Sequence, residues 1–175
     1  MVTITVSGSP GSGKTTVAQL LKKKLQLPYV YSGDIFRKQA EREGMSLEEF
    51  GRYCEQHKDV DKELDRQQLE IIKQGNVIVE GRLAGWLAYQ NNIPAVKIFI
   101  DADQQTRVNR IVNRELGDRE KRKEELVKRE KSEATRYKTY YNIDIDDTSI
   151  YDIVIDSSKK TPEEIVDIIL KKLRM

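Results

Sequence analysis

The chain has 175 residues, of which 38% are hydrophobic and 34% are charged, and its formal net charge is +2. This length suits one compact domain over residues 1–175, and the near-neutral charge balance does not imply nucleic-acid binding. The single cysteine, Cys54, excludes an internal disulfide and a cysteine-based zinc cluster. No signal peptide precedes the first apolar segment, and no apolar run reaches membrane-spanning length. We therefore expect a cytoplasmic protein without a membrane partner, by default a monomer.

The first predicted strand, residues 2–7, leads into the most informative segment of the chain. Residues 8–16 read Gly-Ser-Pro-Gly-Ser-Gly-Lys-Thr-Thr and match the pattern G-x-x-x-x-G-K-[ST]. Apolar residues at helical spacing follow, so a helix is expected next. Strand, glycine loop and helix have the order of a phosphate-binding loop, in which backbone N–H groups and a helix N-terminus hold phosphate. The alternative is a glycine-rich turn that matches by chance.

The residue types of this loop assign chemical roles. Lys14 should reach the β- and γ-phosphates of ATP, and the Thr15 hydroxyl is the expected Mg²⁺ ligand. The expected ATP-binding residues are Gly8, Ser9, Pro10, Gly11, Ser12, Gly13, Lys14, Thr15 and Thr16.

Strands and helices alternate along the rest of the chain, which predicts an α/β fold with a five-stranded parallel sheet flanked by helices. Ser46 and Glu49 have the spacing of a capping box, and Pro162 suits the first turn of the last helix. Further strands are expected at residues 28–31, 76–80, 96–100 and 152–156, and helices at 33–43, 46–57, 61–74, 83–91 and 161–174.

The segment from about residue 106 to 136 contains few apolar residues and many arginines. One interpretation is a solvated pair of helices with ion pairs between successive turns. The other is a mobile lid that shields phosphates during transfer. We favour the lid, because the phosphate loop already predicts a nucleotide site.

Three further segments add narrower patterns. They are Tyr-Ser-Gly-Asp-Ile-Phe-Arg at residues 31–37, Val-Glu-Gly-Arg-Leu-Ala-Gly-Trp at 79–86, and Arg-Glu-Lys-Ser-Glu-Ala-Thr-Arg at 129–136. With the phosphate loop they resemble the P-loop nucleoside monophosphate kinases, and most closely the archaeal-type cytidylate kinases. The resemblance covers nearly the whole chain. It implies the P-loop NTPase fold, with acceptor-binding helices at about 33–74 and an Arg-rich lid at about 106–136.

The resemblance also implies residues of the acceptor site. Arg37 would pair with the acceptor phosphate, for which a bidentate guanidinium is suited, while Ser32 and Asp34 would orient the phosphate and its sugar. Arg82 matches an arginine that contacts the acceptor nucleotide. Asp34 could instead cap the helix that begins near it. Glu80 could support Mg²⁺ through water or could pair with Arg82.

The arginine-rich segment supplies the remaining residues that the resemblance implies. Arg107 and Arg110 begin the lid, and one of them should reach the transferring phosphoryl group. Arg129, Glu133 and Arg136 share one helical face by their spacing. In bacterial relatives this face has the pattern R-x-x-x-D-x-x-R and grips the acceptor's phosphate and base, whereas here the middle residue is a glutamate.

The expected reaction is phosphoryl transfer from ATP, with Mg²⁺, to CMP or dCMP. The preference for a pyrimidine base follows from the resemblance alone. One alternative is a kinase of another small acceptor, such as AMP, UMP or shikimate. Another is an RNA-associated P-loop ATPase that binds RNA through residues 107–136, although no stacking aromatics alternate with those arginines. We expect the adenine between the lid and the turn at residues 157–159.

Overall fold

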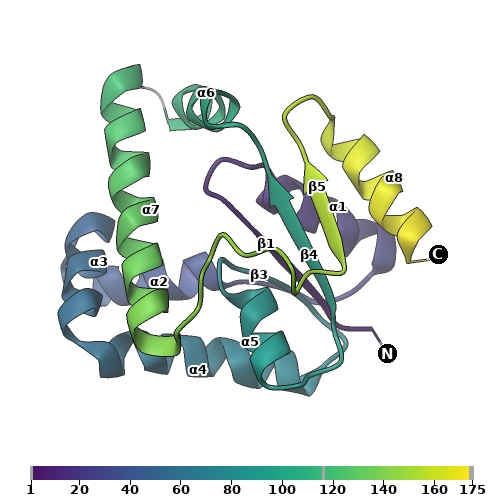
Figure 1. Cartoon of the computed structure of the whole chain (residues 1–175), viewed down its shortest axis with the longest axis horizontal. Coiled ribbons are helices and arrows are strands. Elements are labelled where there is room, and N and C mark those ends of the chain that lie inside the picture. The colour runs from purple at the N-terminus through teal and green to yellow at the C-terminus, as the bar shows by residue number, and fades with distance from the viewer. Residues whose placement is uncertain (1, 116, 174–175) are drawn as a thin grey trace.

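The computed structural model describes residues 2–115 and 117–173, and these residues form one parallel sheet flanked by helices (Figure 1). The strand order is β2-β3-β1-β4-β5, and every neighbouring pair is parallel. The five-stranded parallel sheet expected from the sequence is thus confirmed. The strands are β1 (Ile4–Gly8), β2 (Tyr29–Tyr31), β3 (Ile78–Glu80), β4 (Val96–Asp101) and β5 (Ile153–Asp156).

The helices lie close to the expected ranges, with two differences. The helix expected at 61–74 begins at residue 58, directly after the preceding helix, and the arginine-rich segment continues as a helix to residue 141. The helices are α1 (Lys14–Leu25), α2 (Ser32–Arg42), α3 (Leu47–Gln56), α4 (Lys58–Gln74), α5 (Ala84–Gln90), α6 (Gln104–Glu115), α7 (Arg119–Tyr141) and α8 (Pro162–Lys172).

The helix starts follow from local sequence. The Ser46 hydroxyl accepts a hydrogen bond from the Glu49 N–H, and the Glu49 carboxylate accepts one from the Ser46 N–H, which completes the predicted capping box. Thr161 and Glu164 form the same box at α8, with Pro162 in its first turn. These bonds satisfy N–H groups that have no partner within the helix.

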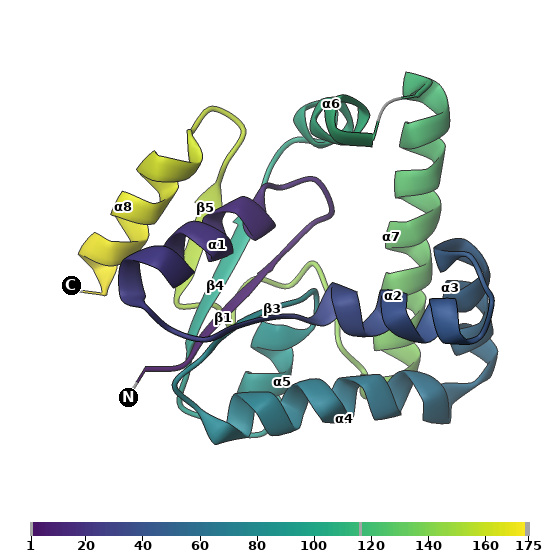
Figure 2. The same ribbon diagram turned by 180° about the vertical axis from the view of Figure 1, so that it is seen from behind.

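Two apolar cores cover opposite faces of the sheet. Ile4 and Ile78 point to the face covered by α1 and α8, while Val79 and Phe99 belong to the core on the other face, with α4 and α5. Successive side chains of a strand point to opposite faces, and strands buried on both faces are therefore almost wholly apolar. Figure 2 shows α1 and α8 in front of the sheet, and Figure 1 shows α5 on the opposite side.

The arginine-rich segment has a small core of its own. Val108 and Ile111 of α6 are buried together with Leu126 of α7. The lower part of α7 lies beside α3 (Figure 2), and Glu133, Arg136 and Tyr137 of this helix are buried. The segment is therefore not a purely solvated pair of helices. Among the described residues, no helix combines the length and the apolar character needed to cross a membrane.

Candidate functional site

The phosphate loop connects the end of β1 to the start of α1, where backbone geometry requires glycine. Gly8 lies so close to β4 that a Cβ atom there would be 1.9 Å from the carbonyl oxygen of Ile100. Gly13 has a φ of +87° and is the N-cap residue of α1. A left-handed conformation directly before a helix suits glycine, and the N–H groups of the first helical turn face the loop.

Lys14 lies beneath this loop and is only 8% exposed. Its ammonium group donates a hydrogen bond of 3.3 Å to the carbonyl oxygen of Ser9. Burial lowers the pKa of Lys14 to about 8; the Glu80 carboxylate acts in the opposite direction, and Arg82 and Arg129 add to the lowering. The arginines expected on the acceptor side are therefore close enough to repel the Lys14 charge.

Thr15 and Glu80 meet at the base of the loop. The Thr15 hydroxyl donates a 2.6 Å hydrogen bond to Oε1 of Glu80, and the Tyr29 hydroxyl donates one of 2.5 Å to Oε2. Glu80 is fully buried. Arg82 pairs with Glu133 instead, so within the described part of the chain the Glu80–Arg82 alternative is not the arrangement found. Since the Thr15 proton is directed to Glu80, the lone pairs of its oxygen suit a cation.

Arg107 anchors α6 to the phosphate loop. Its guanidinium donates hydrogen bonds to the carbonyl oxygens of Pro10, at 3.3 Å, and Ala102, at 3.0 Å. It also pairs with Glu130 of α7 at 2.5 Å. Arg107 is only 9% exposed. In this conformation its guanidinium contacts the outer backbone of the loop.

Arg110, one turn further along α6, binds the other end of the loop. Its guanidinium donates to the carbonyl oxygen of Ser12 at 3.1 Å, and to the hydroxyl and carbonyl oxygens of Ser157 at 2.9 and 2.8 Å. The Ser157 hydroxyl in turn donates to the Ser12 carbonyl at 2.7 Å. Beside this junction lies a cavity of about 260 Å³, lined by Gly11, Ser12, Gly13, Thr16, Val17, Arg110, Arg114, Ser157, Lys160, Pro162 and Ile165.

The start of α2 places the first group of expected acceptor residues. Ser32 donates a 2.7 Å hydrogen bond to the Glu80 carbonyl oxygen, which ties α2 to the end of β3. Asp34 lies inside the first turn of α2 and is not its N-cap, because the helix begins at Ser32. Arg37 is exposed, with its guanidinium carbon 5.8 Å from the centre of the Tyr31 ring.

Glu133 of α7 joins two of the expected arginines. Its carboxylate is 2.7 Å from Nε of Arg82 and 3.0 Å from Nε of Arg129. Burial alone would raise the pKa of Glu133, but the positive charges of Arg129 and Arg82 outweigh it and hold the pKa at about 2. The middle residue of the expected face is thus a paired carboxylate, and it orients both arginines.

Arg136 has a partner that the sequence did not indicate. Its Nε atom lies 2.9 Å from Oδ2 of Asp61 on α4, and each of the two side chains is only 5% exposed. The guanidinium carbon also lies 5.6 Å from the centre of the Phe36 ring. Asp61 and Tyr29 were both missed, because each makes its contact with a residue distant in the sequence and belongs to no short motif.

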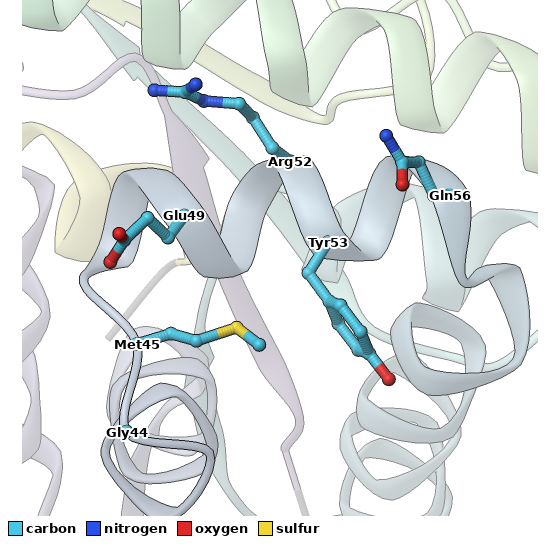
Figure 3. A pocket seen from close by; sticks show the side chains of 6 residues that line it. All are labelled: Gly44, Met45, Glu49, Arg52, Tyr53 and Gln56. Carbon is cyan, nitrogen blue, oxygen red and sulfur yellow. The ribbon is translucent and has the colours of Figure 1, made fainter.

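A second cavity, of about 310 Å³, lies along α3 and the turn that precedes it, lined by Gly44, Met45, Glu49, Arg52, Tyr53 and Gln56. Figure 3 shows Met45 and Tyr53 on one side of α3 and Arg52 extending to the other. Arg52 pairs with Glu48 on the same helix at 2.5 Å. None of the residues expected at the nucleotide site lines this cavity.

A glycine loop at the end of β1, followed by a lysine and a hydroxyl and accompanied by arginines from the turn after β3 and from α7, defines a P-loop kinase. Comparison with known proteins gives the family within this class. The cytidylate kinase-like family matches residues 3–159. The chain belongs to this family.

Archaeal relatives match over nearly the full length. A cytidylate kinase of Methanocaldococcus jannaschii is 48% identical over 167 residues, which cover 95% of this chain and 94% of the relative. One from Methanococcus vannielii is 45% identical over 172 residues, covering 98% and 99%. The archaeal-type resemblance is thereby confirmed.

Solved structures of low sequence identity share the fold. A shikimate kinase from Bacteroides thetaiotaomicron has a TM-score of 0.64 at 15% identity, with 99% of both chains covered. One from Aquifex aeolicus has a TM-score of 0.55 at 22% identity, covering 99% of this chain and 96% of the other. These likenesses concern the fold alone.

Proposed function

We propose that the protein transfers the γ-phosphoryl group of ATP to CMP or dCMP, which yields ADP and CDP or dCDP. The observation that carries this proposal is the meeting of two anion-binding groups at Lys14. The ammonium group of Lys14 is held by the Ser9 carbonyl oxygen of the phosphate loop, and Arg82 and Arg129 are close enough to act on its charge. Two nucleotides could thus bring their phosphates together at this lysine.

ATP would bind with its phosphates in the loop at residues 8–16 and its adenine in the cavity beside Ser157 and Lys160. The backbone N–H groups of the loop and the N-terminus of α1 suit the triphosphate. Lys14 would move from the Ser9 carbonyl to the phosphates. Arg107 and Arg110 would hold the shape of the loop, and one of them would reach the transferring group when the lid at about 106–136 closes.

The residues fit a magnesium ion carried by the nucleotide. No cluster of three or more acidic, histidine or cysteine side chains within residues 2–115 and 117–173 could hold a metal by itself. Thr15 would be the protein ligand, with Glu80 behind it. Held there with the nucleotide, Mg²⁺ would supply positive charge that offsets the negative charge of the phosphates.

The acceptor would lie across the helices at about 33–74. Arg37, Arg82 and Arg129 offer guanidinium groups to its phosphate, and Ser32 and Asp34 lie at the start of the same helix as Arg37. Arg136 and Asp61 place nitrogen donors and carboxylate acceptors together for the base. Alignment and charge stabilisation then account for catalysis, because the phosphoryl group passes directly between the nucleotides.

The alternative of an RNA-associated ATPase is less well supported. Of the arginines on α6 and α7, Arg107, Arg122 and Arg129 are paired with glutamates of α7. Such pairing reduces the positive charge available for a phosphate backbone.

The deciding experiment measures ADP release with ATP and each of CMP, dCMP, UMP, AMP, GMP and shikimate. We expect the highest kcat/KM for CMP or dCMP. Preference for a purine nucleotide or shikimate would replace the proposed acceptor. RNA-stimulated hydrolysis without any of these acceptors would support the ATPase alternative.

A further inference from the structure

Both oxygens of the buried Glu80 carboxylate have a hydroxyl donor, and one of the donors lies outside every motif of the sequence. Thr15 donates to Oε1 at 2.6 Å, and Tyr29 donates to Oε2 at 2.5 Å. Glu80 has no exposed surface. A buried carboxylate needs such donors, and two donors on different oxygens also fix its orientation.

Strand pairing brings Tyr29 to this position. In the parallel register of β2 and β3, Tyr29 lies opposite Ile78, and both pack on the sheet face that α1 covers. Glu80 follows Ile78 by two residues, so it points to the same face. Three elements, β2, β3 and α1, therefore converge on one carboxylate at the end of the sheet.

The consequence concerns the Thr15 hydroxyl. A carboxylate with only one hydrogen-bonded oxygen can rotate about its last side-chain bonds, whereas a second donor holds its plane. Glu80 held in this way keeps the Thr15 proton directed toward itself and leaves the oxygen lone pairs for a cation. We propose that Tyr29 is a positioning residue for the magnesium ion that accompanies ATP, acting through Glu80 on Thr15. This inference rests on the proposed use of MgATP.

Calorimetric titration of the full chain with ATP tests the inference without any acceptor. The wild type, Tyr29→Phe and Tyr89→Phe are titrated in the presence of Mg²⁺ and in its absence, with EDTA. Tyr89 is a matched control, because its side chain lies on α5 against Trp86 and the residue is 53% exposed. Mg²⁺ increases the affinity for ATP, and we expect this increase to be about tenfold smaller in Tyr29→Phe than in the wild type. The affinity for ATP in EDTA should be unchanged. Tyr89→Phe should match the wild type.

Glu80→Gln, alone and combined with Tyr29→Phe, tests whether Tyr29 acts by positioning Glu80 or by supporting the fold in general. If Tyr29 acts through Glu80, then Tyr29→Phe added to Glu80→Gln should change the magnesium-dependent gain no further. If Tyr29→Phe is too unstable for titration, the rise in melting temperature caused by ATP, with and without Mg²⁺, provides the same comparison.

Two results would overturn the inference. One is an unchanged magnesium-dependent gain in Tyr29→Phe, and the other is an equal loss of ATP affinity with and without Mg²⁺. Both presuppose that the wild type binds ATP more tightly with Mg²⁺. A wild type that shows no such binding would instead contradict the proposed function itself.

Discussion

Lys14 is buried and positively charged, and only the protein groups around it compensate this charge. Replacement by alanine removes the charge expected at the β- and γ-phosphates. We predict that Lys14→Ala lowers kcat by about a thousandfold, the scale of losing a well-placed electrostatic contact in a transition state. Coupled ADP-release kinetics measure the effect. Lys22→Ala, on the exposed side of α1, is the control and should retain full activity. A Lys14→Ala variant that is folded and nearly as active as the wild type would contradict the assignment.

Arg37 is exposed and contacts the Tyr31 ring, so its guanidinium is accessible to a ligand. We predict that Arg37→Ala raises the KM for CMP at least about tenfold, because charge-assisted hydrogen bonds to phosphate are lost. The KM for ATP should change little. Arg42→Ala, near the other end of α2, provides the control in the same assay. Equal increases in both KM values would argue against an acceptor role for Arg37.

The ionisation of the Glu133 carboxyl group makes the free energy of unfolding depend on pH. Its pKa is about 2 in the folded protein, against an ordinary value of 4.5. A lowered folded pKa means that its contribution to stability is present above pH 4.5 and is lost as the pH falls toward 2. This contribution of Glu133 to the free energy of unfolding is about 3 kcal/mol. Urea unfolding should show that the wild type and Glu133→Gln differ in free energy of unfolding, and that this difference becomes smaller as the pH falls from 5 to 3. A constant difference would contradict this prediction.

The packing between α6 and the upper part of α7 depends on few apolar contacts. Val108, Ile111 and Leu126 form the small core between them. We predict that Leu126→Ala, which leaves a cavity in this core, weakens local stability by about 2 kcal/mol or more. Hydrogen exchange should become faster in α6 and α7 while β1 and β4 retain their protection. Uniform acceleration across the sheet would mean that the two helices unfold only with the whole protein.

The sequence predicts elements well where the signal is local. The glycine loop, the capping box at Ser46 and the apolar strands each follow from a few adjacent residues, and the structure has them where expected. The end of α7 was predicted less well, because charged and polar side chains such as Glu133 form much of its buried face. Hydropathy cannot indicate burial that depends on ion pairs with distant residues.

The same limit applies to the candidate site. Sequence pattern predicts the loop, and the resemblance predicts the arginines of the site. The Asp61–Arg136 pair and the Tyr29–Glu80 hydrogen bond connect segments that only the fold brings together. The contacts of Arg107 and Arg110 with loop carbonyls were likewise outside the reach of spacing arguments, since they depend on where α6 crosses the phosphate loop.

The proposed reaction requires water to be excluded when both nucleotides are bound. We predict that ATP analogue and CMP together reduce the radius of gyration, as the lid at about 106–136 and the helices at about 33–74 approach each other. Small-angle X-ray scattering measures this change, with each ligand alone as the control. An unchanged radius with both ligands bound would show that the lid does not close.

The backbone around residues 8–13 is supported from outside by two guanidinium groups and the Ser157 hydroxyl. The loop therefore adopts its phosphate-binding shape when the chain folds, before a nucleotide binds. When a nucleotide binds to a loop that already has its binding conformation, little conformational entropy of the chain is lost. Capture of the first nucleotide can therefore be fast and independent of the second, which leaves the larger rearrangements for the moment when both are present.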